Sequence, residues 1–331
     1  MRLNPDQTIT FSATDLSNFI SCQHLSQLDK RRANGELKPP SFVDPYADTV
    51  RELGLEHEER FVQYLRDQGK NVIDLRDIGG ENGLDKTLAA MKQGADVIVQ
   101  AVFDNGKWRG YADVLLKCDK PSDLGDWSYE VGDSKLAQYT KAGTELQLCV
   151  YSDLLTEVQG VKPKKMYVIK PGGEAQPEEF LYQNYDAYYR FIKGRLIVAI
   201  EGNHGPTVGG SNSTQTYPNP VAHCNVCRWW MHCDQRRRDD DHLSYVAGMQ
   251  GGHVTELNER GVHTLEAFAK RSQALDSRPA KGSAETYEKL HRQAGIQYEG
   301  RVKNEHISRL LDSEINEGLH RLPAPSEGDI Y

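Results

Sequence analysis

Residues 109–137 read RGYADVLLKCDKPSDLGDWSYEVGDSKLA and contain two apolar runs separated by a turn-rich connection. Each run carries one acid, Asp113 in YADVLL and Asp133 in YEVGDSK, and Lys135 follows two residues later. Side chains two apart in a strand share a face, so Asp133 and Lys135 are expected on the same side. Pairing of the two runs as a hairpin would bring Asp113 beside Asp133. Two carboxylates beside a lysine predict a divalent-metal and water-activating site.

The elements around this stretch alternate between strand and helix patterns. Helices are predicted over 12–33, capped by Ser12 or Thr14, and over 45–69. Beyond these, strands are predicted at 71–75, on both sides of an Asn-Gly turn at 105–106, at 127–137 and at 164–169. Helices are predicted at 83–94, 141–158 and 185–201. This order predicts an α/β fold with a mixed sheet covered by helices.

Composition limits the class of protein. A chain of 331 residues holds one large core or two domains. The net charge of −8 argues against a uniformly basic surface, but it leaves room for a local basic channel. No apolar run approaches the length of a bilayer-spanning helix, and MRLNPDQTITF has no apolar signal region. We therefore expect a soluble, cytoplasmic protein without a membrane partner.

The C-terminal third changes character. Residues 202–220 are rich in Gly, Ser, Thr, Asn and Pro and are predicted to be a loop or linker. From 243 the pattern is helical, and two short helices around a Gly-containing turn fit either a helix–hairpin–helix-like element or a packing appendage. The end, LPAPSEGDIY, resembles a proline-rich link entering another strand. The expected organisation is a domain over 1–242, a helical appendage over 243–320 and a linker over 321–331.

Three cysteines crowd into one polar stretch, HCNVCRWWMHC, with the spacing C-x2-C-x5-C: Cys224, Cys227 and Cys233. This crowding favours metal ligation over three unrelated buried cysteines. A zinc site could be completed by His223 or His232. Cys22, which taken alone is best explained as a buried core cysteine, could instead complete a four-cysteine iron–sulfur site. Spacing leaves zinc and iron–sulfur open.

The remaining candidates have ordinary explanations. Cys118 and Cys149 fall in a predicted strand and helix, where a core position is expected. His57 lies among glutamates in the predicted helix 45–69, where a lone histidine is usually a solvated surface residue. The basic runs 30–32 and 236–238 flank the cysteines and could form a local backbone-binding surface, or the second could pair with the acids 239–241.

Taken in order, several short motifs resemble one family. They are ATDLSNFISCQHLSQLD, the G-x-x-H-E of residues 54–58, YADVLL, GDSKLA, the Q-x-x-x-Y of 147–151 and YPNPVAHCNVCRWWMHCDQRRRDDDHLSYVAGM. The set is similar to the RecB-like branch of PD-(D/E)xK nucleases with an iron–sulfur cluster. Relatives include CRISPR-associated RecB-like exonucleases, the AddB nuclease domain and uncharacterised bacterial RecB-family nucleases. In the last group this unit precedes a ribonuclease-H-like domain and often a helicase.

The resemblance implies a restriction-endonuclease-like mixed sheet flanked by helices. An iron–sulfur cluster would hold the peripheral helices together. It implies a Mg²⁺ or Mn²⁺ ion with these ligands: His57, Asp113, Asp133 and the carbonyl of Ser134. Lys135 would orient or activate the attacking water, and Gln147 and Tyr151, one helical turn apart, would help place the nucleic-acid strand. A [4Fe–4S] cluster, favoured by the resemblance over zinc, would be held by Cys22, Cys224, Cys227 and Cys233.

The function implied is hydrolysis of DNA phosphodiester bonds, on single strands or ends, in repair, recombination or defence. The alternative is a catalytically weak module that binds and loads DNA for a larger helicase–nuclease. A helicase or ribonuclease-H-like domain, in cis or in trans, is the expected protein partner, and the chain would then be an N-terminal fragment or a truncated relative. Position 133 is Asp where many relatives have Glu, which reaches further toward a metal.

Overall fold

The computed structural model describes residues 1–331 apart from 42–45, 77–81, 203–215, 311–317, 325 and 329–331. It divides into two compact units, Met1–Cys233 and Asp234–Tyr331. Most of the predicted loop 202–220, part of the predicted C-terminal helical stretch and the last residues of the predicted linker lie outside the described residues. Within the described part of the chain, no helix combines the length and apolarity needed to cross a membrane.

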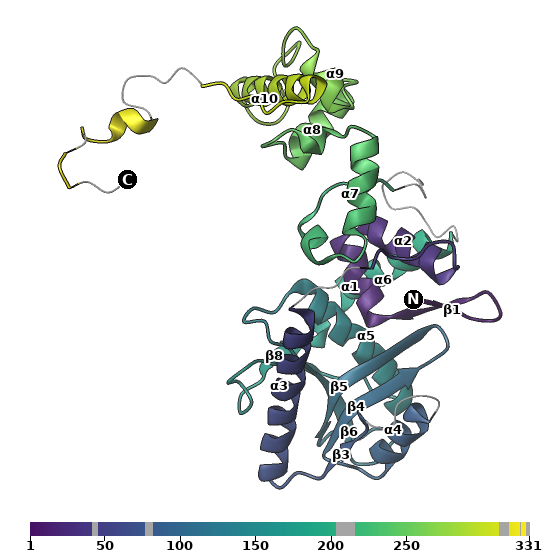
Figure 1. The fold of residues 1–331 in the computed structure, drawn as a ribbon. Coiled ribbons are helices and arrows are strands. Elements are labelled where there is room, and N and C mark those ends of the chain that lie inside the picture. Colours follow the sequence, from purple (N-terminus) through teal and green to yellow (C-terminus); the bar gives the residue numbers. More distant parts are fainter. Residues whose placement is uncertain (42–45, 77–81, 203–215, 311–317, 325, 329–331) are drawn as a thin grey trace. The chain divides into compact units, whose positions relative to one another are not determined.

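The first unit is built on a mixed sheet of eight strands (Figure 1). The strands are β1 (Arg2–Leu3), β2 (Ile9–Ser12), β3 (Val72–Asp74), β4 (Val97–Asp104), β5 (Trp108–Cys118), β6 (Ser128–Ser134), β7 (Lys165–Ile169) and β8 (Glu178–Leu181). β5 is central, because β4 pairs along one edge while β2 and β6 pair with opposite ends of the other edge. The short strands β1, β2 and β8 were not predicted from the sequence, whereas the Asn-Gly hairpin between β4 and β5 is confirmed.

Helices cover both faces of this sheet. The helices of this unit are α1 (Ala13–Ser21), α2 (Gln23–Ala33), α3 (Ala47–Asp67), α4 (Gly83–Lys92), α5 (Ala142–Gln159) and α6 (Asp186–Glu201), and of these α2 packs in a separate apolar cluster with Trp229. α3 lays Phe61 and Val62 on one face, over Val97, Val99 and other apolar side chains. The opposite face forms the main core with α1, α4, α5 and α6. The predicted α/β architecture with a helix-covered mixed sheet is confirmed.

The predicted single helix over 12–33 is wrong, because the chain breaks at Cys22. Ser12 begins α1 with a capping box to Asp15, as one of the two predicted caps. Cys22 is extended, with φ −164° and ψ 111°, and it ends α1 and begins α2. Its sulfur accepts a hydrogen bond from the Leu25 amide at 3.4 Å. As the N-cap of α2, the sulfur accepts from an amide that a continuous helix would pair with a backbone carbonyl.

The second unit is helical and has its own core. The helices α8 (Gly251–Glu259), α9 (Leu265–Ala269) and α10 (Ala284–Lys303) bury an apolar cluster that includes Leu257, Phe268 and Tyr287. The turn between α8 and α9 holds Gly261 at φ +76°. Its amides are used internally, since Arg260, Gly261 and Val262 all donate to carbonyls of α8. These contacts favour the packing explanation of this element over binding of a nucleic-acid backbone by turn amides.

Candidate active site

The antiparallel pairing of β5 with β6 brings the two predicted acids together. Val114 pairs with Gly132, which sets Asp113 opposite Asp133 at the end of the ladder. The amide of Ser134 donates to Oδ2 of Asp113 at 2.8 Å, so Ser134 contacts the site through its amide. The ammonium of Lys135 lies 2.5 Å from Oδ2 of Asp133, on the side that strand alternation predicts. The hairpin inferred from the sequence is confirmed.

Burial and like charge dominate the electrostatics of this pair. Asp133 is 3% exposed, and burial together with the Asp113 carboxylate raises its pKa to about 7, against the opposing effect of Lys135. A cation bound between the buried Asp133 and the partly buried Asp113 would offset the repulsion of the two carboxylates.

Gly132 is required for this hairpin to pack. A Cβ at position 132 would lie 2.7 Å from Cγ1 of Val114 and 3.2 Å from Cδ1 of Ile169, both in the buried core under α3. We expect Gly132→Ala to lower the free energy of unfolding by about 1–3 kcal/mol through overpacking. Urea unfolding measures this loss.

Gly54→Ala is the matched control, because its Cβ would meet nothing within 4 Å in α3. It is expected to leave the stability unchanged or to raise it by up to about 1 kcal/mol. Equal unfolding midpoints for Gly132→Ala and the wild type would show that Val114 and Ile169 move aside without loss of stability.

His57 is buried, so its explanation as a solvated surface histidine is wrong. The imidazole is 1% exposed, and its Nε2 lies 3.0 Å from the carbonyl oxygen of Ile169. That carbonyl also accepts from the amide of Lys135, which places the ring next to the end of β6. Because Nε2 must carry a proton to donate there, Nδ1 of the neutral ring presents a lone pair. Nδ1 is buried without a hydrogen-bond partner, and Oε1 of Glu174 is 4.0 Å away.

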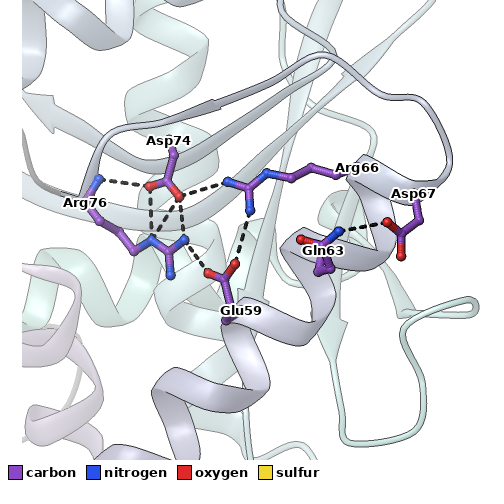
Figure 2. Close-up of polar contacts among 6 residues, drawn as sticks. All are labelled: Glu59, Gln63, Arg66, Asp67, Asp74 and Arg76. Carbon is purple, nitrogen blue, oxygen red and sulfur yellow. Dashed lines mark hydrogen bonds and ion pairs between the residues drawn. The ribbon is translucent and has the colours of Figure 1, made fainter.

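An ion-pair network fixes the helix that carries His57. Figure 2 shows Arg66 and Arg76 bridging Glu59 of α3 and Asp74 of β3. Both guanidinium groups reach both carboxylates, so four charges share one network rather than forming isolated surface pairs. Hydrogen bonds to the two acids raise the pKa of Arg76, and its charge is permanent. The network holds the turn of α3 after His57 against the sheet.

Two residues that sequence reasoning did not assign lie at the same site. Nε2 of Gln100 donates to Oε1 of Glu58 at 3.0 Å and to Oδ1 of Asp113 at 3.3 Å. Burial raises the pKa of Glu58, and the neighbouring Asp113 raises it further. A sequence signal existed for both, because Glu58 follows His57 in the G-x-x-H-E motif and Gln100 is the polar residue of an otherwise apolar run, VIVQAVF.

Tyr151 and Gln147 of α5 have different surroundings. Burial raises the pKa of the Tyr151 hydroxyl, and Asp133 and Asp113 raise it further, so the ring lies beside the two acids. A Cβ on Gly110 would lie 2.5 Å from Cε1 of Tyr151, which makes glycine necessary under the ring. Gln147 instead donates to Oγ of Ser17 in α1 at 3.3 Å. Tyr151 thus belongs to the acidic site, and Gln147 contacts α1.

The cysteines predicted as ligands come together from distant parts of the chain. Cys22, Cys227 and Cys233 belong to one apolar cluster with Leu25, Leu28 and Trp229. Burial raises the pKa of the Cys227 thiol, and the neighbouring Cys22 and Cys224 raise it further, so these sulfurs are close. Backbone amides donate to the sulfurs of Cys22, Cys224 and Cys227, each at 3.4 Å. As expected for a core residue, Cys149 is fully buried, whereas Cys118 is half-buried with its sulfur 3.1 Å from Oγ of Ser128.

A buried acid joins the two chain segments that carry these cysteines. Asp29 of α2 is 1% exposed and accepts from the Trp229 indole at 2.9 Å and from Arg228 at 2.8 Å. The basic run after Cys233 is neutralised within its own unit. Arg236 pairs with Asp240, while Arg237 and Arg238 pair with Asp234. These ion pairs favour the prediction that the basic run 236–238 pairs with acids over the prediction of a free basic surface. One partner, Asp240, lies in the predicted range 239–241, and the other, Asp234, lies outside it.

Across the described residues, no three His, Cys, Asp or Glu side chains converge in a geometry that could hold a metal ion. The acids lie close to one another, and so do the cysteines, but neither group has three side chains placed to bind one ion. No protein-family model matches the chain, and no curated protein matches it.

Proposed function

We propose that this chain is a metal-dependent DNA nuclease with a restriction-endonuclease-like core, as the motif resemblance implies. One observation carries the proposal: Asp113, Asp133 and Lys135 lie together at the end of β6. The ring of His57, whose Nδ1 has no hydrogen-bond partner, contacts the carbonyl of Ile169, which pairs with Ser134 at that end. Oxygen and imidazole donors in one acidic, buried place suit Mg²⁺ or Mn²⁺. Asp113, Asp133 and His57 Nδ1 would hold the ion, with the carbonyl of Ser134 as a further ligand.

The chain's own groups account for the rest of the chemistry. When bound, the divalent ion supplies Lewis acidity to the scissile phosphate and to the attacking water. Lys135, positioned by Asp133, would hold that water by its ammonium and favour loss of the water's proton. The carbonyl of Ile169 fixes the tautomer and orientation of His57, a supporting role typical of metal-ligating histidines. Tyr151 would border the strand being cut.

The cysteines support a [4Fe–4S] cluster as a structural part of this nuclease. In such a cluster each thiolate binds a different iron, so the four sulfurs need not converge on one point. Amide donors to Cys22, Cys224 and Cys227 are the hydrogen bonds that stabilise negative sulfur. The cluster would join Cys22, between α1 and α2, to residues 224–233, which end in the first turns of α7 (Trp230–Asp239), and Asp29 already joins α2 to this segment. A helicase or ribonuclease-H-like domain, in cis or in trans, is the proposed partner.

Cleavage of end-labelled DNA tests the function. Wild type with Mg²⁺ or Mn²⁺ is expected to cut single-stranded DNA or DNA ends and to stop in EDTA. Asp113→Ala and Lys135→Ala are expected to slow cleavage by about 10²–10⁴-fold, because one removes a metal ligand and the other the group that handles the water's proton. Asp126→Ala is the matched control, since Asp126 is exposed in the connection between the same two strands.

The outcomes separate the two candidate functions. Cleavage that survives both substitutions would refute the proposed site. A wild type that binds DNA but never cuts it, with either metal, would favour the alternative of a DNA-loading module. The product ladder of an active wild type gives the polarity of cleavage.

A further inference from the structure

The strand β4 departs from regular geometry at one residue of the acidic site. Gln100 has φ +53°, a left-handed conformation that is uncommon for a residue with a side chain. The neighbouring pairs Val99–Val114 and Ala101–Ala112 keep the same register, so the strand neither gains nor loses a residue there. Left-handed residues within a strand are strained, and such strain gathers at functional sites.

The unusual backbone reverses the side-chain alternation of the strand. Before position 100, Ile98 faces the core beneath α5, while Val97 and Val99 face α3. After it, Ala101 and Phe103 face the core beneath α5. Regular alternation would give residue 100 the same face as Ile98 and would bury an amide in the apolar core. The left-handed turn sends Gln100 toward Glu58 of α3 instead.

The carboxamide of Gln100 then lies between two acids. Its nitrogen carries two N–H groups, and it donates to Glu58 at 3.0 Å and to Asp113 at 3.3 Å. The reverse orientation would set its oxygen against two carboxylates, so the hydrogen-bond network itself selects this one. Asp113 is consequently held at both oxygens, by Gln100 at Oδ1 and by the amide of Ser134 at Oδ2.

From this geometry we propose that Gln100 is a positioning residue of the metal site. Its carboxamide holds the Asp113 carboxylate beside Asp133. Its second N–H holds the Glu58 carboxylate at the same site, as an additional acid near the cation. The proposal rests on the metal site of the proposed function and adds two residues to it. A neutral donor suits this role, because lysine or arginine at position 100 would cancel the negative charge that attracts a divalent ion.

Calorimetric titration of the full chain with Mn²⁺ tests the role directly. Gln100→Gly retains the left-handed backbone without cost and removes the carboxamide. It is expected to bind Mn²⁺ about 10–100-fold more weakly than wild type, the usual effect of removing a group that orients a metal ligand. Its melting temperature in EDTA should stay within a few degrees of wild type. Raising Mn²⁺ should restore most of its cleavage rate.

Gln7 provides a matched control, since it is an exposed glutamine that also has a left-handed backbone, with φ +66°. Gln7→Gly is expected to bind Mn²⁺ as wild type does. Gln100→Asn, which tolerates positive φ but is too short to reach both acids, repeats the comparison if the glycine variant unfolds.

Unchanged Mn²⁺ affinity in a folded Gln100 variant, with an active wild type, overturns this inference alone. A wild type that binds no Mn²⁺ overturns the proposed function and this inference together.

Discussion

Asp133→Asn is expected to slow DNA cleavage strongly and, in the metal-free chain at pH 8, to make the fold more stable. The two effects have one cause. The raised pKa of Asp133, about 7, means that its charge is unfavourable in the folded chain without a cation, and that same charge would bind the metal. Losing this ligand should reduce cleavage by about 100-fold or more.

The pH dependence of the stability gain follows from the sign of the shift. The unfolded carboxyl titrates near pH 4 and the folded one near 7. Above pH 4 the unfolded chain releases this proton first, so the stability contributed by the protonated acid is lost as the pH rises toward 7. At pH 8 the ionised acid costs on the order of 2–4 kcal/mol, which asparagine avoids, and the gain shrinks at pH 5.

Urea unfolding in EDTA at pH 5 and pH 8 measures this gain, and Asp126→Asn controls for removal of an exposed charge in the same connection. A variant less stable than wild type at pH 8 would mean that the Lys135 pair outweighs burial and repulsion.

Anaerobic purification is expected to give a brown protein with about four iron atoms per chain. Cys224→Ser and Cys227→Ser should lose the colour and most of the iron. Their melting temperatures should also fall, because binding energy at a structural metal site adds to folding energy. The half-buried thiol of Cys227, whose pKa is raised, must release its proton to bind, so reconstitution should be faster at pH 8 than at pH 6.

Cys118→Ser is the matched control, since its sulfur faces Ser128 in the β5–β6 hairpin rather than another cysteine. This variant should keep both colour and iron. A colourless wild type with one zinc per chain would instead support three thiolates completed by His223 or His232.

Patterns of local sequence predict most of this architecture. The Asn-Gly turn at 105–106 gives the β4–β5 hairpin, and the apolar runs on both sides of the 119–127 connection give β5 and β6. Because strand alternation is strictly local, the shared side of Asp133 and Lys135 could be inferred without a structure. The proximity of Asp113 to Asp133 required one further assumption, the pairing of adjacent runs.

Tertiary contacts account for what the sequence did not reveal. The pattern of α3 suggests a continuous apolar side, but Leu53 and Leu55 are about half exposed. The buried residues of α3 are His57, Phe61 and Val62, in its second half. Nothing in the glutamates beside His57 indicates its burial, which depends on the carbonyl of Ile169 over one hundred residues later. The left-handed conformation of Gln100 likewise depends on Glu58 and on the opposite strand.

The buried Asp29 has a consequence for synthesis of the protein. Its partners Trp229 and Arg228 are made about two hundred residues later, so the nascent α2 has neither its indole nor this arginine while the sheet forms. At about 5–20 residues per second, the ribosome needs roughly 10–40 s to cover that interval. During this time Asp29 has Arg32 beside it, 3.9 Å away on the same helix, but it lacks the hydrogen bonds from Trp229 and Arg228 that stabilise the buried carboxylate. We therefore expect α2 to complete its packing late, after the sheet strands have left the ribosome, and a chain cut short before residue 228 to lack these contacts of α2.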